Sequence, residues 1–353
     1  VDAMIALTRE LMDAGVAYEK LRSVYFNIGR VPSYGELSGK DLGKIRMGAT
    51  VDLERYDKND PRDFTLFRRS TLGELRKGVS YKTEWGNVRP SWHVQCSAMA
   101  RATLGDRFDI HMASVELVFP HNENEIAQIR ALTGKPQAQF WLHSELVLVN
   151  GKKMTHEEGC VTLQDLIDRG YSSREIRFFL LRHHYRQPVW LTDERLEEAR
   201  ASLRRIDEFV SNLQEVRTEG EHVEEVAGWV VGMKETFRAS LYDDVNLPAA
   251  IAGIFRLIRQ VNHVMGQGKL CEACAKLVLE GLTEVDRVLS ILPALEPQQA
   301  IPQEIASLLK ERDEARSRKD FARADEIRAL LQERGWVVED RATGLRVRRK
   351  EDR

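Results

Sequence analysis

Apolar side chains recur along the chain with two different periods, and each change of period marks an element. Ile5, Leu7 and Leu11 follow a helical spacing that predicts an opening helix ending near Gly15. From 24 to 68 the apolar residues form short runs separated by turn residues, a pattern that predicts short strands. The chain is therefore expected to begin with a helix followed by strands.

The middle of the chain alternates between the two periods. A loop is expected at 84–91, where glycine and proline fall close together, and a helix at Trp92–Ala102. The pattern predicts a buried strand at Phe108–His111, a helix at His121–Thr133 and another strand at Phe140–Leu148. Strand, helix and strand at this spacing predict a parallel α/β layer.

Helical periodicity dominates from Leu163 onward and predicts a helical bundle. Prolines then mark a linker, and two charged helices and a hairpin are predicted beyond it. The predicted fold class is mixed α/β and α, with a parallel α/β region, a helical bundle and a small α+β C-terminal domain. The predicted domain ranges are 1–85, 86–171, 172–300 and 301–353.

Composition and charge narrow the class of protein. The net charge of −2 excludes a globally basic nucleic-acid binder but leaves room for a local basic face. No run approaches the ~18 apolar residues that a membrane helix needs, and no signal-peptide pattern opens the sequence. Four cysteines are too few for a disulfide scaffold in a chain of this length, which fits a reducing compartment. We therefore expect a cytoplasmic protein that does not enter a membrane.

Three side chains form a candidate metal site. His121 and Glu125 lie four residues apart and would share one face of the predicted helix. Together with the thiolate of Cys96 they offer a ligand set that suits zinc. A lone cysteine and a His/Glu pair also occur by chance, so the spacing by itself leaves both interpretations open.

Longer segments carry a specific resemblance. They are Asp60–Phe64, Arg89–Met99, Phe108–His111, Phe119–Gln128, Arg182–Arg186, Asp243–Pro248 and Arg318–Arg328. In sequence and in order, these segments resemble cysteinyl-tRNA synthetase, a class I aminoacyl-tRNA synthetase. The resemblance extends over the whole chain and implies the ATP-dependent ligation of cysteine to tRNA.

The resemblance also gives each predicted region a role. Residues 1–85 would be the connective region of the catalytic domain, and 86–171 the second half of its Rossmann-type sheet, so that this domain is only partly present. Residues 172–300 would be a bundle of the kind that binds tRNA, and 301–353 a domain that recognises the anticodon.

By resemblance, Cys96, His121 and Glu125 hold a zinc ion that binds the thiolate of the substrate. Trp92 and His111 match residues that line the cysteine pocket. The family's fourth zinc ligand belongs to a front segment that is absent from this sequence. We therefore expect zinc to bind more weakly than at a four-ligand site.

The sequence departs from the family in its ATP-binding motifs. The HIGH motif, which binds phosphates at a helix N-terminus, belongs to the absent front segment. The KMSKS loop is Lys153-Met154-Thr155-His156-Glu157 here, which leaves Lys153, Met154 and His156 as catalytic candidates. His156 replaces a lysine and is mostly neutral at pH 7, and Glu157 would repel ATP.

Further substitutions fall around the same nucleotide site. Met112 and Ala113 stand where the family has glycines, and their side chains would fill space next to a nucleotide. Glu116 replaces an aspartate, Asn122 replaces the second histidine of a pair, and Gln95 replaces a glutamate. These changes indicate relaxed or redirected use of ATP, while the zinc-facing residues are kept.

The last thirteen residues offer a basic face to RNA. Their cations are Arg341, Arg346, Arg348, Arg349, Lys350 and Arg353. By resemblance this region contacts the anticodon end of tRNA, with Trp336 as a stacking surface. A solvated basic tail is the alternative interpretation.

Three functions follow from the resemblance and the departures. The first is a catalytically impaired paralogue that still binds tRNA. The second is an active cysteine–tRNA ligase whose front half is supplied by another chain or lies outside this sequence. The third, a ligase that joins cysteine to a small amine, is disfavoured because the bundle and the C-terminal domain are intact. The sheet edge left by the absent strands would call for a homodimer or a partner chain to cover it.

Overall fold

The computed structural model describes residues 1–40, 58–156, 159–217, 223–293, 302–318, 320–341 and 344–349. The chain divides into two compact units. The first comprises Val1–Leu163 and His183–Thr192, and the second comprises Gln164–Arg182 and Asp193–Arg353.

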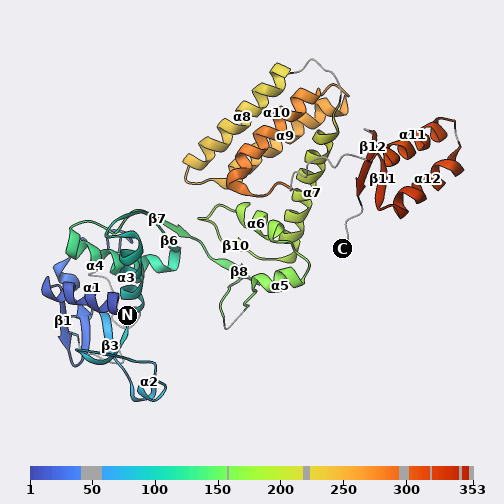
Figure 1. Ribbon diagram of the computed structural model, residues 1–353. Helices are drawn as coiled ribbons and strands as arrows, with labels where there is room; N and C mark the ends of the chain where they lie inside the picture. The colour runs from blue at the N-terminus through green and yellow to red at the C-terminus, as the bar shows by residue number, and fades with distance from the viewer. Residues whose placement is uncertain are drawn as a thin grey trace. The chain divides into compact units, whose positions relative to one another are not determined.

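The first unit combines helices with an antiparallel sheet (Figure 1). Its helices and short turns are α1 (Asp2–Asp13), η1 (Ile28–Arg30), α2 (Leu72–Arg76), α3 (Trp92–Leu104), η3 (Val115–Leu117), η4 (Val118–Asn122) and α4 (Glu123–Thr133). The sheet has the order β1-β2-β3-β5-β4 and pairs antiparallel throughout. Its strands are β1 (Ala17–Lys20), β2 (Ser23–Phe26), β3 (Phe64–Arg69), β4 (Tyr81–Thr83) and β5 (Gly86–Pro90).

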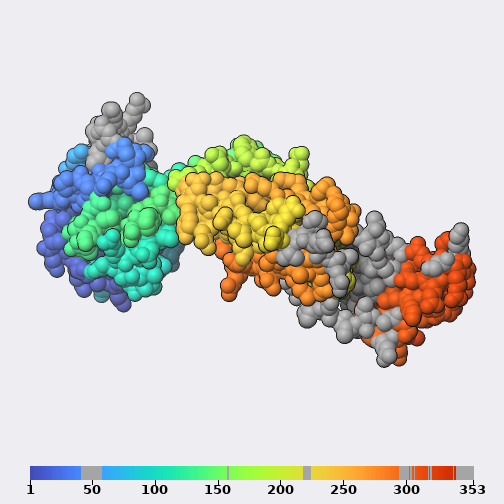
Figure 2. Space-filling view, turned by 90° about the horizontal axis from the view of Figure 1, so that it is seen from above, coloured from blue at the N-terminus to red at the C-terminus, as the bar shows by residue number. Residues whose placement is uncertain are grey.

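The core of this unit lies between the sheet and three helices. Leu7 and Leu11 of α1 are buried in one cluster with Phe26 and Leu66 of the sheet and with Val94 of α3. The helical spacing of the α1 residues places both on one face, as the sequence predicts. Figure 2 shows the first segments of the chain, in blue, lying against the green segments around α4. This packing fixes the positions of α3 and α4, the two helices that carry Cys96 and Glu125.

The strand β5 is a correction to the sequence analysis, which expected a loop at 84–91. Glycine and proline at its ends suggested a break, but β5 pairs with both β3 and β4. Gly86 has a φ of 98° at the tight turn between β4 and β5, a conformation that glycine adopts without strain. The long-range pairing therefore decides the structure of this segment, and the glycine serves only the turn.

A separate parallel pair is formed by β6 (Phe108–Ser114) and β7 (Ala138–Ser144), with His111 opposite Trp141. The predicted parallel layer is therefore present, but the predicted burial of its first strand is wrong. Ile110 and Phe140 are exposed, and Met112 is 72% exposed. In the described part of the chain no third strand pairs with β6 or β7, so apolar side chains on this pair stay uncovered.

A small sheet combines two strands that come before α5 (Leu163–Asp168) and α6 (Ser173–Leu181) with one strand that follows them. Its strands are β8 (Val147–Val149), β9 (Lys152–Lys153) and β10 (Val189–Trp190), in the order β10-β8-β9. Asn150 and Gly151 form the predicted turn between β8 and β9, and both have positive φ. This hairpin places Lys153 at the end of β9.

The second unit is mainly helical, as predicted. Its helices are α6 (Ser173–Leu181), α7 (Asp193–Glu215), α8 (Val223–Tyr242), α9 (Leu247–Gly266), α10 (Glu272–Leu289), α11 (Gln303–Ser317) and α12 (Phe321–Glu333), with α5 (Leu163–Asp168) at the boundary between the units. Helix α8 packs against α9 and α10, and both of these contact α7, so that the helices lie side by side in Figure 1. The hairpin of β11 (Trp336–Arg341) and β12 (Gly344–Arg349) packs against α12.

Two features of the helical region bear on the sequence predictions. Cys271 and Cys274 are joined in a disulfide at the start of α10, whereas the small number of cysteines predicts a reducing compartment. Among the described residues, no helix is both long and apolar enough to cross a membrane.

Candidate metal centre

Three side chains of the first unit converge on one point. Cys96 comes from α3, Glu125 from α4, and His121 from the turn η4 that leads into α4. One potential ligand atom of each residue lies within 4.8 Å of the other two. The structure therefore brings together all three residues that the sequence suggests as metal ligands.

Two of these residues carry a buried atom that lacks a hydrogen-bond partner among the described residues. The atoms are His121 Nδ1 and Glu125 Oε2, and both side chains are buried. Leaving a buried polar atom unpaired costs about 1–3 kcal/mol, and more for a charged group. Both atoms can donate a lone pair to a metal ion, and the thiolate of Cys96 completes a ligand set that suits zinc. The residues present thus fit a zinc ion.

The neighbouring carboxylate of Glu123 shows that burial alone does not explain why Glu125 Oε2 lacks a hydrogen-bond partner among the described residues. Glu123 is also buried, two residues before Glu125. Its two carboxylate oxygens accept backbone N–H groups, from Ser38 at 2.7 Å and from Gly35 at 3.1 Å. The same turn of helix therefore satisfies one buried carboxylate completely and leaves an oxygen of the other available to a ligand.

The two residues expected to bind substrate border this cluster. The ring of Trp92 lies next to that of His121, with centroids 4.6 Å apart, and Trp92 is 61% exposed. Nε2 of His111 lies 3.9 Å from Glu125 Oε2. The His111 ring stacks on Trp141 with centroids 4.3 Å apart. An accessible aromatic face and a histidine thus stand at the edge of the metal ligands.

The protonation of the two histidines differs because their surroundings differ. Burial acts to lower the pKa of His121, but hydrogen bonds to Cys96 and Glu125 outweigh it and raise the pKa to about 9. Burial lowers the pKa of His111, and the charge of Glu125 only partly opposes this effect. Without a metal ion, His121 is therefore protonated at pH 7, whereas His111 is neutral.

Sequence reasoning missed two residues that contact this cluster. Asn122 Nδ2 donates a hydrogen bond to Glu125 Oε1 at 3.0 Å, and Asn122 Oδ1 lies 3.0 Å from His143 Nε2. The sequence analysis names Asn122 only as a substitution and does not name His143. His143 interrupts the apolar run Phe140–Val149, and this break was the signal that could have identified it.

The three candidates in the altered ATP loop have different surroundings. Lys153 lies at the end of β9, where its ammonium forms an ion pair with Glu116. The backbone N–H of Met154 donates to the carbonyl of Val147 at 3.0 Å. His156 is exposed, and Glu157 lies outside the described residues.

The predicted RNA contacts belong to the second unit. Trp336 is only 8% exposed and packs in an apolar cluster with Ile327 and Leu331. The structure thus places Trp336 in the core of the C-terminal domain and not on its surface, which argues against the expected stacking. Its burial follows from the packing of β11 on α12, which the sequence pattern does not reveal.

The predicted arginines stand on the terminal hairpin. Arg341 ends β11, and Arg346, Arg348 and Arg349 lie on β12. The register pairs Arg346 with Glu339. Lys350 and Arg353 lie outside the described residues.

Comparison with known proteins accounts for these features together. The family model described as the class I tRNA synthetase (C) catalytic domain matches residues 1–201. A cysteinyl-tRNA ligase anticodon binding domain matches 298–348, and a DALR domain matches 236–293. The cysteine–tRNA ligase of Chlamydia pneumoniae is 39% identical over 99% of this chain and 74% of its own length. The chain belongs to the cysteine–tRNA ligase family.

Other members of the cysteine–tRNA ligase family match this chain with similar identity and over similar shares of both chains. Those of Shouchella clausii and Methanosarcina acetivorans are 38% and 37% identical, over 99% and 100% of this chain and 74% and 75% of their own lengths. Among solved structures, that of a putative arginyl tRNA synthetase from Campylobacter jejuni is similar with a TM-score of 0.48 and 12% identity, over 82% of this chain and 61% of that one. A likeness at that level does not bear on the activity.

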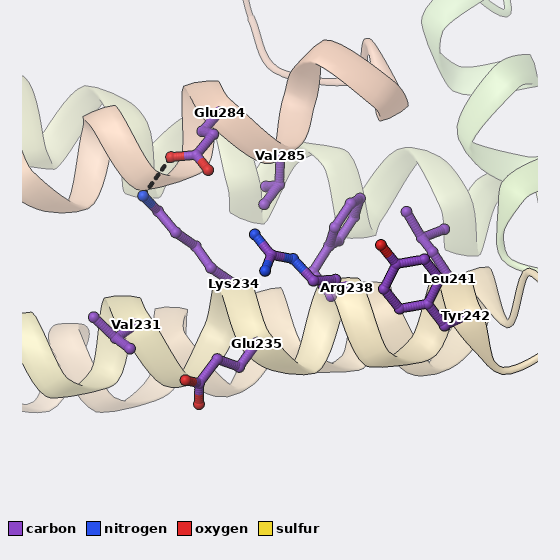
Figure 3. Close-up of a pocket in the computed structure, with 9 residues that line it drawn as sticks. Val231, Lys234, Glu235, Arg238, Leu241, Tyr242, Glu284 and Val285 are labelled. Carbon is purple, nitrogen blue, oxygen red and sulfur yellow. Dashed lines mark hydrogen bonds and ion pairs between the residues drawn. The ribbon is translucent and has the colours of Figure 1, made fainter.

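A groove of about 550 Å³ also lies on the second unit of this cysteine–tRNA ligase family member, between α8 and α10 (Figure 3). Lys234 and Glu284 form an ion pair across it. Arg238 also lines the groove, and Tyr242 is 84% exposed at its end. The groove's described lining contains neither histidine nor cysteine, so nothing in it resembles the metal centre of the first unit.

Proposed function

We propose that this member of the cysteine–tRNA ligase family binds cysteine through a zinc ion, binds tRNA, and forms cysteinyl-adenylate poorly. The observation that carries the proposal is the cluster of half-buried Cys96 with buried His121 and Glu125, two of whose atoms lack a hydrogen-bond partner among the described residues. In a chain of this family, zinc held by such a cluster would recognise a substrate that contains sulfur.

A bound zinc ion would supply a Lewis acid that prefers a thiolate to a hydroxyl, which separates cysteine from serine. The side chains around it perform the other tasks. Trp92 offers an apolar surface to the short substrate side chain and limits the access of water. His111 is neutral at pH 7, because burial lowers its pKa, and it can therefore hydrogen-bond a substrate without repelling an ammonium group.

The weak adenylation follows from the charges at the altered loop. Phosphate transfer depends on cations that neutralise the developing negative charge. Lys153 is the lysine that remains in the loop, and its ammonium is paired with the carboxylate of Glu116. ATP must displace this carboxylate before the lysine can assist, and His156 supplies no fixed charge.

Binding of tRNA is supported by the two matched domains of the second unit. The match over 298–348 is to an anticodon binding domain, and β12 carries Arg346, Arg348 and Arg349 within it. Clustered arginines provide the local charge that RNA backbones require.

Binding and activity can be measured separately on the same purified chain. We expect about one zinc ion per chain, lost on Cys96→Ala, and tighter binding of cysteine than of serine by the zinc-loaded protein. We expect cysteine-dependent ATP–pyrophosphate exchange far below that of a relative such as the Chlamydia pneumoniae ligase. A chain that takes up no zinc, or that binds serine as well as cysteine, would refute the proposal.

One observation favours a second function, an active ligase completed by another polypeptide. Parallel strands are ordinarily covered on both faces, whereas Ile110, Met112 and Phe140 of the β6–β7 pair are exposed. A second copy or a partner that supplies the remaining catalytic segment would cover them. Exchange activity that appears only when the front segment of a relative is added would establish this alternative, and sedimentation would reveal a dimer.

A further inference from the structure

The side chain of Asn122 is placed between two residues that the proposed metal centre depends on. It is completely buried, directly before α4. Its amide lies 3.0 Å from Glu125 Oε1 on one side and 3.0 Å from His143 Nε2 on the other.

The chemistry of the groups fixes the direction of both hydrogen bonds. An ionised carboxylate only accepts, so the end of the Asn122 amide that faces Glu125 must be the NH2 group. The other end is then the carbonyl oxygen, which accepts a hydrogen bond, so His143 must present an N–H at Nε2. The three residues form a chain in which His143 orients Asn122 and Asn122 orients Glu125.

This chain determines which carboxylate oxygen of Glu125 can reach a metal ion. Oε1 accepts from Asn122 and also lies 3.0 Å from His121 Nε2. Oε2 has no hydrogen-bond partner among the described residues. With Oε1 held on both sides, the carboxylate cannot rotate without breaking two hydrogen bonds, and the buried Oε2 remains available to a metal ion.

We propose that Asn122 is a positioning residue of the metal centre, which holds Glu125 in the orientation that binds the ion, and that His143 fixes the amide in turn. This inference rests on the proposed metal site and adds to it the residues that orient a ligand. An amide does this without carrying charge, so it brings no positive charge close to the ion.

The test is the affinity of the full-length chain for zinc, measured by competition with a chromophoric chelator. Asn122→Leu keeps the branched shape and the number of heavy atoms but cannot hydrogen-bond, and we expect it to weaken zinc binding about 10- to 100-fold, the range typical of residues that orient metal ligands. Gln128→Leu is the matched control, because Gln128 is a fully buried amide of α4 that donates a hydrogen bond to the carbonyl of Asn124. Its zinc affinity should stay within about threefold of wild type.

A second pair of variants tests the hydrogen bond between His143 and Asn122. It also keeps the proposal testable if Asn122→Leu does not fold. His143→Phe removes the donor to Asn122 and should weaken zinc binding, whereas His143→Gln retains an N–H donor and should restore most of it. The absorption bands of bound Co²⁺ should shift in Asn122→Leu and His143→Phe but not in Gln128→Leu, because they report the ligand geometry at the ion.

The outcomes separate this inference from the proposed function. If the wild-type chain takes up neither zinc nor Co²⁺, the metal site itself fails and the inference with it. If the wild-type chain binds zinc and the folded Asn122→Leu and His143→Phe variants bind it equally well, only the role of Asn122 is overturned.

Discussion

His93 connects the candidate site to the sheet through both of its ring nitrogens. Nε2 lies 2.8 Å from the carbonyl oxygen of Thr65 and therefore carries the hydrogen. Nδ1 faces the amide nitrogen of Asn124 at 3.4 Å and therefore accepts. Both contacts suit a neutral ring, and burial lowers the pKa of His93 to about 4.

We predict that His93 makes the fold less stable in acid. The unfolded chain takes up a proton at His93 near pH 6.5, whereas the folded chain resists it until about pH 4. Between these values the unfolded state binds more protons, so the free energy of unfolding falls as the pH falls. From pH 7 to pH 5 this loss is about 1–2 kcal/mol.

His93→Gln keeps the donor to Thr65 and cannot titrate. Urea unfolding of the variant, followed at several pH values, should show a correspondingly smaller loss of stability between pH 7 and pH 5. An unchanged slope would show that His93 is not responsible for the acid sensitivity.

At the residue scale we also predict that Glu116 competes with ATP for Lys153. Glu116→Gln removes the ion pair, and an exposed pair of this kind contributes up to about 1 kcal/mol. ATP affinity should therefore increase by up to about fivefold in equilibrium dialysis. Glu19→Gln makes the same charge change on an exposed residue of β1 and should leave ATP affinity unchanged.

Helix packing in the second unit depends on a close approach at Gly281. A Cβ added there would lie 2.6 Å from Val230 Cγ1 of α8, whereas at Gly228 it would meet no heavy atom of the described residues within 4 Å. The two glycines thus lie on neighbouring helices, but a side chain at Gly281 would clash with Val230, whereas Gly228 has space for one. Gly281 is the contact that allows α10 to pack closely on α8.

We predict opposite effects for alanine at these two positions. Gly281→Ala should lower the free energy of unfolding by about 1–3 kcal/mol because it overpacks the interface. Gly228→Ala should raise it by about 0.5–1 kcal/mol, since alanine favours the helix. Denaturant melts of both variants measure the difference, and stabilisation by Gly281→Ala would contradict this packing.

For the whole molecule, the net charge of −2 means that any attraction for tRNA must be local. We predict that Arg346→Gln combined with Arg348→Gln weakens tRNA binding and reduces the slope of log K against log salt by about 1.5–2. A filter-binding titration at several salt concentrations measures both quantities.

The matched control for this prediction neutralises two exposed lysines of the first unit, Lys77 and Lys82. It removes the same net charge from the molecule and should change the salt slope much less. Equal slopes for the two double variants would show that the terminal hairpin is not the RNA contact.

The sequence by itself determined the family, the parallel α/β layer, the helical bundle and the terminal hairpin, because periodicity and motif order are local properties. It also singled out Cys96, His121 and Glu125, because a chemical ligand set can be recognised without coordinates. These three residues meet because α3 and α4 pack against the same sheet.

Only the tertiary structure decided the environments of individual side chains. Trp336 is buried, β5 is a strand and the β6–β7 pair is uncovered, because each depends on which distant segment packs against it. The chain from His143 through Asn122 to Glu125 was likewise invisible, since β7 and the turn before α4 are brought together only by the fold. Contacts between distant segments decide whether a polar side chain is a ligand, a support or a surface group, and sequence spacing does not encode them.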